Sequence, residues 1–258
     1  MTAQSTQTNK SSSIALYLIL AYAFTWACWI PALVLANWQG YLLPTIANLP
    51  QLWASGGMTD PTHQALAVVF SLAVYGPLLA SLIATGLERG EKGLQDLWGR
   101  IFKWQISWKW YLIGAGIALL IPIIPRLLAE ISGTVNREAG GITWTLPMLL
   151  GVFLWQTITS GLGEEPGWRG YLLSRLKSRF DLNRAIWLVG LAWAVWHYPF
   201  TIYDTLSKMN EVPAAAAAIT VVMSLLGQTL SLIGMSYIYA WLVNNTGSVF
   251  LAILFHGF

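Results

Sequence analysis

The chain has 258 residues, of which 14 are Lys or Arg and 11 are Asp or Glu, so that 10 % of residues are charged and 56 % are apolar. A soluble globular domain carries roughly 25 % charged residues, and this chain has too few polar side chains to cover a soluble surface. Intrinsic disorder requires low hydrophobicity and high net charge, so it is excluded as well. The composition predicts a membrane protein surrounded by lipids. The net charge of +3 does not indicate a nucleic-acid partner, because a few basic residues on cytoplasmic loops give the same balance.

Several stretches of the chain are apolar enough to cross a bilayer. A hydrocarbon core about 30 Å thick requires about 20 mostly apolar residues per helix. In chain order, the candidate spans are residues 13–36, 65–87, 110–129, 145–165, 185–200, 214–243 and 247 to the end. We therefore predict an all-α fold, a polytopic bundle of about seven transmembrane helices, or eight if the chain continued. Residues 1–258 are predicted to form a single integral membrane domain.

Basic residues concentrate in two of the segments that connect these spans. Residues 88–109 and 166–184 each contain five Lys or Arg, whereas 37–64 contains none and 130–144 and 201–213 contain one each. Cytoplasmic loops of membrane proteins carry an excess of Lys and Arg. The pattern predicts a multi-pass protein whose N-terminus and two basic segments are cytoplasmic. In a bacterium it would lie in the cell membrane.

Ionisable residues are rare inside the predicted spans, and each is therefore a candidate for function. Glu164 and Glu165 end the fourth span. His197 ends the fifth span, and His256 lies in the last. Arg169 follows Glu165 by four residues, the spacing at which side chains meet on a helix. We expect this arginine to keep Glu165 ionised and oriented, so that Glu164 alone carries the variable proton.

Each of these residues also has an interpretation without function. A pair of glutamates at a helix end can mark the boundary between membrane and water, and Arg169 can be one more cation of a cytoplasmic segment. A single histidine in a span is more often a hydrogen-bonded core residue than a catalyst. The combination favours function, because two carboxylates, an arginine and two histidines are difficult to place in lipid without mutual pairing.

The depth of these residues in the membrane can be compared. The helices that carry His197 and His256 are expected to begin at the cytoplasmic side, and a rise of about 1.5 Å per residue places both imidazoles at a similar level. Glu164 would lie nearer the cytoplasmic surface if its helix were a full span. Pro166 and Gly167 therefore predict that this helix stops below the surface and that its broken backbone lines a water-filled cavity.

A carboxylate beside a second carboxylate in a partly dry cavity suits general-base work on a water molecule. Histidine can share the proton, donate to a developing oxyanion or bind a metal. These groups together favour amide hydrolysis. Other classes of intramembrane protease lack their motifs here: there is no His-Glu-x-x-His, and Gly234-Met-Ser236-Tyr-Ile lacks the closing glycine of a serine-protease motif. Asp204 has no second Asp in another span with which to form an aspartyl pair.

Three segments carry the polar residues in a fixed order. They are Glu164-Glu165-Pro-Gly-Trp-Arg169, Trp193-Ala-Val-Trp-His197, and Tyr239–Ser248 followed by Leu251–His256. The first matches the Glu-Glu-x-x-x-Arg motif of the CAAX-prenyl-protease and bacteriocin-processing (CPBP, or Abi) family of intramembrane endopeptidases. The second resembles that family's motif of an aromatic residue and a histidine, and the third resembles the lead-in to its His-x-x-x-Asn motif. The similarity covers about residues 145–258, the predicted catalytic motif region.

The resemblance implies an intramembrane endopeptidase that cleaves peptide bonds at a cavity open to the cytoplasm. By position, Glu164 and His197 would activate the hydrolytic water and His256 would donate to the oxyanion, with Glu165 and Arg169 in support. The family has also been described as metalloproteases. The resemblance therefore allows two mechanisms. In the glutamic mechanism Glu164 activates water without a metal, and in the metal mechanism Glu164, His197 and His256 would hold a divalent ion such as zinc. The implied substrates are peptides or proteins, either prenylated CAAX proteins or bacteriocin-type peptides.

One feature of the family motif falls outside the sequence. The asparagine would stand four residues after His256, and the sequence given stops at Phe258. We therefore expect an active protein to continue past Phe258.

A second class of protein also stays open. A non-enzymatic membrane protein, such as an immunity factor, a chaperone or a transporter, could use the same groups to bind a partner or relay protons. Hydrolysis requires Glu164, His197 and His256 to converge on one water-sized site, because catalytic groups act within hydrogen-bond reach or through one water. A separation of more than about 10 Å between the Glu164 carboxylate and the two imidazoles would favour the non-enzymatic protein.

Overall fold

The computed structural model describes residues 2–46, 48–133, 145–209 and 212–258. Within these ranges the chain forms helices and the turns between them, without a strand, so the predicted all-α fold is confirmed. Most of the predicted loop 130–144 lies outside the described residues. Five of the described helical segments are long and apolar enough to cross a membrane, and there are up to six if a bent pair of helices is one span.

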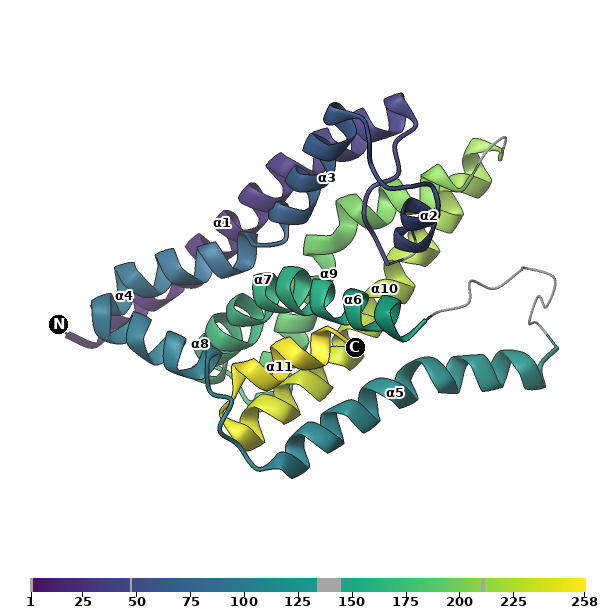
Figure 1. Cartoon of the computed structure of the whole chain (residues 1–258). Coiled ribbons are helices and arrows are strands. Elements are labelled where there is room, and N and C mark those ends of the chain that lie inside the picture. The colour runs from purple at the N-terminus through teal and green to yellow at the C-terminus, as the bar shows by residue number, and fades with distance from the viewer. Residues whose placement is uncertain (1, 47, 134–144, 210–211) are drawn as a thin grey trace.

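Figure 1 shows the helices and their order. The bounds are α1 Thr2–Gln39, α2 Leu49–Ala54, α3 Pro61–Ala73, α4 Gly76–Ile101, α5 Trp108–Ile131, α6 Leu146–Gln156, α9 Leu182–Ser207, α10 Ala214–Thr246 and α11 Val249–His256. Between α6 and α9 the helix continues through η1 Thr157–Gly161, α7 Leu162–Glu165, η2 Pro166–Leu172 and α8 Leu173–Lys177, where η1 and η2 are π-helical. We call the whole segment Leu146–Lys177 the central helix.

Six of the seven predicted spans correspond to long helices or to the bent pair of α3 and α4. The seventh is instead the eight-residue helix α11. Gly247 ends α10 in a left-handed conformation with φ of 64°, and the Ser248 side chain accepts a hydrogen bond from the Leu251 N–H to begin α11. Eight residues rise about 12 Å, far less than the thickness of the hydrocarbon core.

The bend of 44° between α3 and α4 follows from Pro77. Proline has no N–H, so the carbonyl of Ala73, four residues earlier, loses its helical donor. The Thr25 hydroxyl of α1 donates to that carbonyl over 2.8 Å. Because the freed carbonyl is paired, the bend is compatible with a buried position in the membrane.

The prediction that the helix carrying Glu164 stops at Pro166 is wrong. The central helix runs on to Lys177, and Pro166 begins the π-helical turn η2. A π-helical turn bonds residues five apart, so the carbonyl four residues before a proline can accept a hydrogen bond from the residue that follows the proline. Glu164 and Glu165 therefore lie in the interior of a 32-residue helix and not at its end.

Glycines allow other segments to approach the central helix closely. A Cβ added at Gly161 would lie 2.5 Å from the carbonyl oxygen of Ile253 in α11, and one at Gly163 would lie 2.7 Å from that of Val74. Both contacts are with backbone atoms, which cannot move aside cheaply. These two glycines thus set the positions of α11 and of the bend between α3 and α4 beside Glu164.

This packing gives a stability prediction. Gly161→Ala is expected to lower the free energy of unfolding by about 1–3 kcal/mol, because the added methyl group overpacks the contact with α11. Gly151→Ala, on the same helix with open space around its Cβ position, is the matched control and is expected to be neutral or slightly stabilising. Thermal unfolding in detergent measures both. Equal melting temperatures for the two variants would show that the close contact is not needed.

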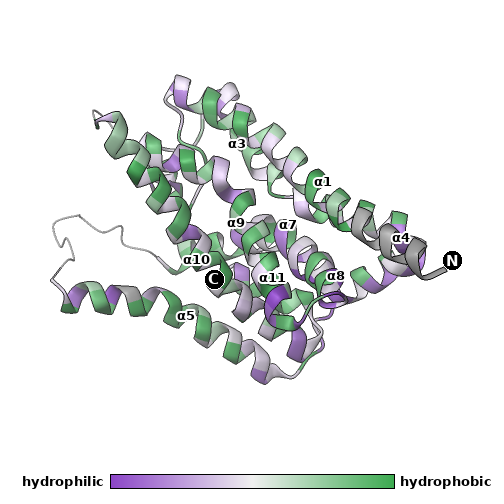
Figure 2. Cartoon of the chain, turned by 180° about the vertical axis from the view of Figure 1, so that it is seen from behind, coloured by the Kyte–Doolittle hydropathy of each residue, from purple (hydrophilic) through white to green (hydrophobic). Residues whose placement is uncertain are grey.

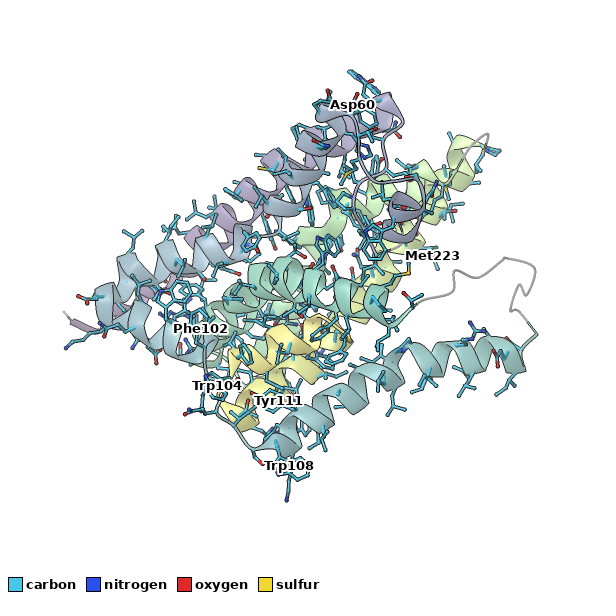
Figure 3. The ribbon with its side chains drawn as sticks, viewed as in Figure 1. Asp60, Phe102, Trp104, Trp108, Tyr111 and Met223 are labelled. Carbon is cyan, nitrogen blue, oxygen red and sulfur yellow. The ribbon has the colours of Figure 1, made fainter. Side chains whose placement is uncertain are left out.

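The outer surface of the bundle is apolar. Figure 2 shows hydrophobic residues along the outward sides of the long helices, and Ile19, Leu72 and Leu128 are more than half exposed. Phe102 and Trp108 lie exposed near the connection between α4 and α5 (Figure 3), as aromatic residues do at the boundary between lipid and water. An apolar outside of this extent fits an integral, multi-pass membrane protein.

Candidate active site

Three charged side chains of the central helix are buried together. Glu164, Glu165 and Arg169 have exposed fractions of 2 %, 0 % and 1 %. Buried charges of this kind require partners. Arg169 Nη1 donates to Glu165 Oε1 over 3.0 Å, so the two side chains meet as their spacing predicts. Arg169 Nη2 also donates to the Ser236 hydroxyl over 3.1 Å.

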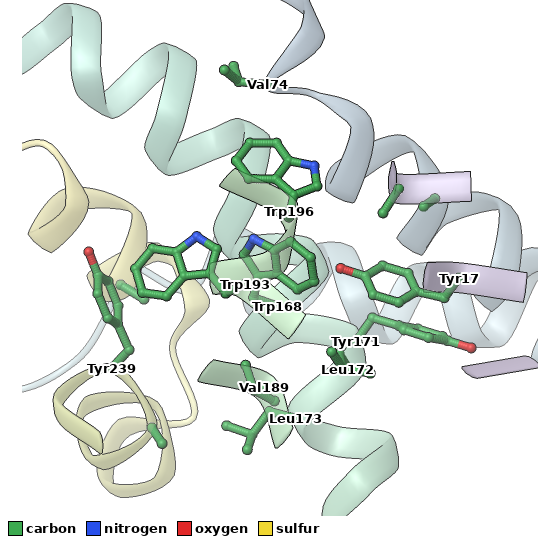
Figure 4. Close-up of a cluster of buried hydrophobic side chains, with 14 of the residues drawn as sticks. Tyr17, Val74, Trp168, Tyr171, Leu172, Leu173, Val189, Trp193, Trp196 and Tyr239 are labelled. Atoms are coloured by element: carbon green, nitrogen blue, oxygen red, sulfur yellow. The ribbon is translucent and has the colours of Figure 1, made fainter. Parts of the chain in front are cut away.

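The guanidinium of Arg169 contacts two aromatic rings that are perpendicular to each other. Its central carbon is 4.2 Å from the ring centroid of Trp193 in α9 and 4.2 Å from that of Tyr239 in α10. Figure 4 shows these two rings next to each other in the core. Attraction between a cation and ring faces is stronger where water is excluded. The two rings therefore hold the plane of the guanidinium, which in turn holds Glu165.

The two oxygens of Glu164 have different surroundings. The indole N–H of Trp193 donates to Oε2 over 2.6 Å, and both groups are buried. Oε1 lies 3.9 Å from His256 Nε2, which is longer than a direct hydrogen bond. One oxygen is thus fixed by the protein, and the other faces an imidazole without a direct hydrogen bond to it.

His256 is oriented by Glu165. Its Nδ1 is 2.8 Å from Glu165 Oε1. An ionised carboxylate can only accept, so Nδ1 donates this bond and Nε2 is the nitrogen directed at Glu164. Glu165 Oε1 therefore links Arg169 to His256.

His197 is oriented by its own helix. Its Nδ1 lies 2.9 Å from the backbone carbonyl oxygen of Trp193, and because a carbonyl only accepts, Nδ1 is the donor. The lone pair of the neutral ring is then on Nε2. A structural role and a catalytic role are both compatible with this tautomer, but the position of His197 on a cavity wall favours contact with a ligand.

A cavity of about 310 Å³ reaches Glu164 and His197. Most of its wall is apolar and aromatic, with contributions from Trp29, Ile46, Phe70, Val74, Trp155 and Phe200. Asp204 and Lys208, which form an ion pair of 2.6 Å, also line it. Among the described residues on the wall, His256 does not appear. The wall also includes the polar residues Thr45, Ser71, Gln156, Thr159 and Ser160. The cavity therefore combines apolar surface with several polar groups, as a small binding site does.

The structure brings all five predicted site residues together. The Trp193 ring lies 5.9 Å from the His197 ring and 5.8 Å from the His256 ring, between centroids, while its N–H contacts Glu164. Glu164 thus lies on one cavity wall with His197 and 3.9 Å from His256. Three contributors were not predicted as site residues: Trp193, which the sequence offers only as the aromatic residue of the second motif segment, Tyr239 and Ser236. For the last two the sequence offers less. Their only signal in the sequence is that Tyr239 opens the third motif segment, and nothing there shows which face of α10 meets Arg169.

The predicted metal ligands do not form a metal site in this arrangement. Among the described residues, no group of three or more His, Cys, Asp or Glu side chains is placed to hold a metal ion. The bonds of Glu164 Oε2 to Trp193 and of His256 Nδ1 to Glu165 leave Glu164 Oε1 and His256 Nε2 facing each other 3.9 Å apart. Because the described side chains are not grouped as a metal site, we derive no step through a metal.

The second half of the chain matches a known protein family. Residues 146–258 match the family described as Rce1-like, type II CAAX prenyl endopeptidase Rce1-like. The chain is also 26 % identical over 227 residues to CAAX prenyl protease 2 of Methanococcus maripaludis, an alignment that covers 84 % of this chain and 80 % of that protein. Both matches support the CPBP family, so the resemblance predicted from the three motifs is confirmed.

Proposed function

We propose that this chain is an intramembrane endopeptidase, similar to CAAX prenyl proteases, in which Glu164 is the general base that activates water. The family matches support a peptidase of this kind. The observation that carries the assignment of the base is the separation of 3.9 Å between Glu164 Oε1 and His256 Nε2. Two groups at this distance can contact one water molecule, and the apolar cavity beside Glu164 can receive a peptide.

The hydrogen bonds of the site support a division of roles. Glu164 takes a proton from water as the water oxygen attacks the peptide carbonyl carbon, and it returns that proton to the leaving nitrogen as the C–N bond breaks. Protonated His256, with Nδ1 bound to Glu165, donates from Nε2 to the carbonyl oxygen as negative charge develops there. His197 assists the proton transfer through its free Nε2. Glu165 and Arg169 stay paired and touch no reacting atom.

Peptide cleavage is the test of this function. Purified protein is incubated with peptides that end in a prenylated CAAX sequence, the same peptides without the lipid, and bacteriocin-type precursor peptides. We expect cleavage of one of these classes, read by mass spectrometry. Binding of a peptide without any cleavage would favour the non-enzymatic alternative, an immunity factor, a chaperone or a transporter.

Chelation separates the glutamic mechanism from the metal mechanism. Because no group of three or more His, Cys, Asp or Glu side chains among the described residues is placed to hold a metal ion, we expect the cleavage rate after dialysis against a strong chelator to stay within about twofold of the untreated rate. Loss of activity that zinc restores would assign a metal to Glu164, His197 and His256, and would contradict the mechanism proposed above.

We further propose a side of the membrane for the cavity, which depends on the side on which the N-terminus lies. The sequence predicts a cavity open to the cytoplasm. However, the cavity wall includes Thr45, Ile46 and Lys208, from the segments 37–64 and 201–213 that carry few cations. In Figure 1 the α2 region and the junction of α9 with α10 lie at one end of the bundle, and α8 lies at the other. With a cytoplasmic N-terminus, these wall residues would face away from the cytoplasm.

Cysteine labelling tests the orientation. In a Cys28→Ser background, which removes the single cysteine of the chain, Lys208→Cys is expected to react with a membrane-impermeant thiol reagent added to intact cells. Arg179→Cys, which follows α8 and lies within the basic segment 166–184, is expected to react only after permeabilisation. The reverse pattern would place the N-terminus outside and the observed cavity on the cytoplasmic side.

A further inference from the structure

The Trp193 side chain contacts four of the five predicted site residues. Its N–H donates to Glu164, its face covers the guanidinium of Arg169, and its ring lies edge-on to both histidine rings. The sequence motif requires only an aromatic residue at this position. What tryptophan adds to a phenylalanine of similar packing is the N–H group.

The bond from Trp193 to Glu164 has properties that a bond from a titrating group lacks. An indole N–H only donates and carries its proton throughout the range in which proteins function. Its acceptor Oε2 is 2.6 Å away, and the two side chains are 3 % and 2 % exposed, so water does not compete for the bond. With Oε2 held in this way, the carboxylate cannot rotate freely, and Oε1 stays directed at His256.

Other tryptophans show that packing in this core does not itself demand a bonded N–H. The indole nitrogens of Trp168 and Trp196 are fully buried, and neither has a hydrogen-bond partner in the described part of the chain. All three side chains lie in the same cluster (Figure 4). The pairing of Trp193 with Glu164 is therefore a specific feature of the site and not a general consequence of burying an indole.

We propose that Trp193 is a positioning residue, which holds Glu164 so that Oε1 is presented to the hydrolytic water and to His256. The inference rests on the proposed function, because it assigns Trp193 a role through the base Glu164. Trp193 itself touches no reacting atom.

Trp193→Phe removes the N–H and leaves an aromatic ring on Arg169. A hydrogen bond to a charged group contributes enough that its loss in a buried site is expected to lower kcat on the order of 10- to 100-fold. KM is expected to change by less than about threefold, because the cavity that receives the peptide does not include Trp193 among its described lining residues. The matched control is Trp168→Phe, which removes an unpaired indole N–H and is expected to leave kcat and KM unchanged.

Isosteric replacement keeps the test decisive if phenylalanine at position 193 disturbs the fold. β-(3-Benzothienyl)alanine has the shape of tryptophan with sulfur in place of the N–H. At position 193 it is expected to reproduce the loss in kcat at an unchanged melting temperature, and at position 168 to have no effect. Wild-type kcat with this residue at position 193 would overturn the inference while the proposed function stands. A wild-type protein that cleaves no peptide would overturn the proposed function, and the inference with it.

Discussion

Replacing Glu164 with glutamine is expected to lower the rate of peptide cleavage by about 10²- to 10⁴-fold, the range attributed to a general base. Glutamine has nearly the same shape as glutamate, and its amide oxygen can still accept the hydrogen bond from Trp193. The buried helix therefore keeps its packing, but the side chain can no longer take a proton from water. Steady-state cleavage measures the effect, and the melting temperature in detergent reports whether the fold is intact.

The control for this substitution is Glu91→Gln. Glu91 is an exposed residue of α4 that accepts a hydrogen bond from Gln95, far in sequence from the proposed site. The substitution at Glu91 removes the same charge as that at Glu164. Because Glu91 does not belong to the proposed site, the Glu91→Gln variant is expected to keep wild-type activity. Cleavage at the wild-type rate by Glu164→Gln would remove Glu164 from the mechanism.

Replacing Arg169 has the second large expected effect. Arg169→Met leaves Glu165 charged and buried without its partner, which is expected to lower the free energy of unfolding by about 3–5 kcal/mol. Arg169→Lys keeps the charge, but an ammonium group cannot reproduce the planar guanidinium that bonds to Glu165 and Ser236 while it contacts both rings. We expect the lysine variant to fold and to lose most of its activity, because Glu165 then no longer fixes His256.

The chain offers a matched control for Arg169. Arg126 and Glu130 form an ion pair with the same spacing of four residues, but their side chains are 72 % and 40 % exposed. Arg126 lies near the end of α5 with its side chain on the outside of the bundle, and lysine keeps its charge, so Arg126→Lys is expected to change neither stability nor activity. If Arg169→Lys behaved in the same way, Arg169 would be one more determinant of topology and not a support of the site.

The charged part of the site could be predicted from the sequence, because charge is rare in the spans. Glu164, Glu165, Arg169, His197 and His256 all stand out in an apolar chain, and the family resemblance adds a role for each. Trp193 and Tyr239 do not stand out in the same way, because the chain has 15 Trp and 10 Tyr. Their roles depend on how α9 and α10 are rotated against the central helix, and a single sequence does not contain that rotation.

The sequence predicted the all-α class of the fold, but not how the helices bend or continue at their prolines. Hydropathy locates long helices well, since each must supply its own backbone hydrogen bonds in lipid. The effect of a proline inside a span depends instead on its neighbours. At Pro77 the Thr25 hydroxyl replaces the lost donor and the helix bends. At Pro166 a π-helical turn accommodates the ring and the helix continues.

Hydrolysis at this site is tested most directly by cleavage in water labelled with heavy oxygen. Purified protein is incubated with a cleavable peptide, and the mass of the new carboxyl terminus is measured. Activation of water by Glu164 predicts one labelled oxygen in the product of the wild-type protein, and almost no product from Glu164→Gln at an unchanged melting temperature. Labelled product formed at equal rates by both proteins, or peptide bound by both and cleaved by neither, would contradict the assignment of Glu164 as the base of an intramembrane endopeptidase.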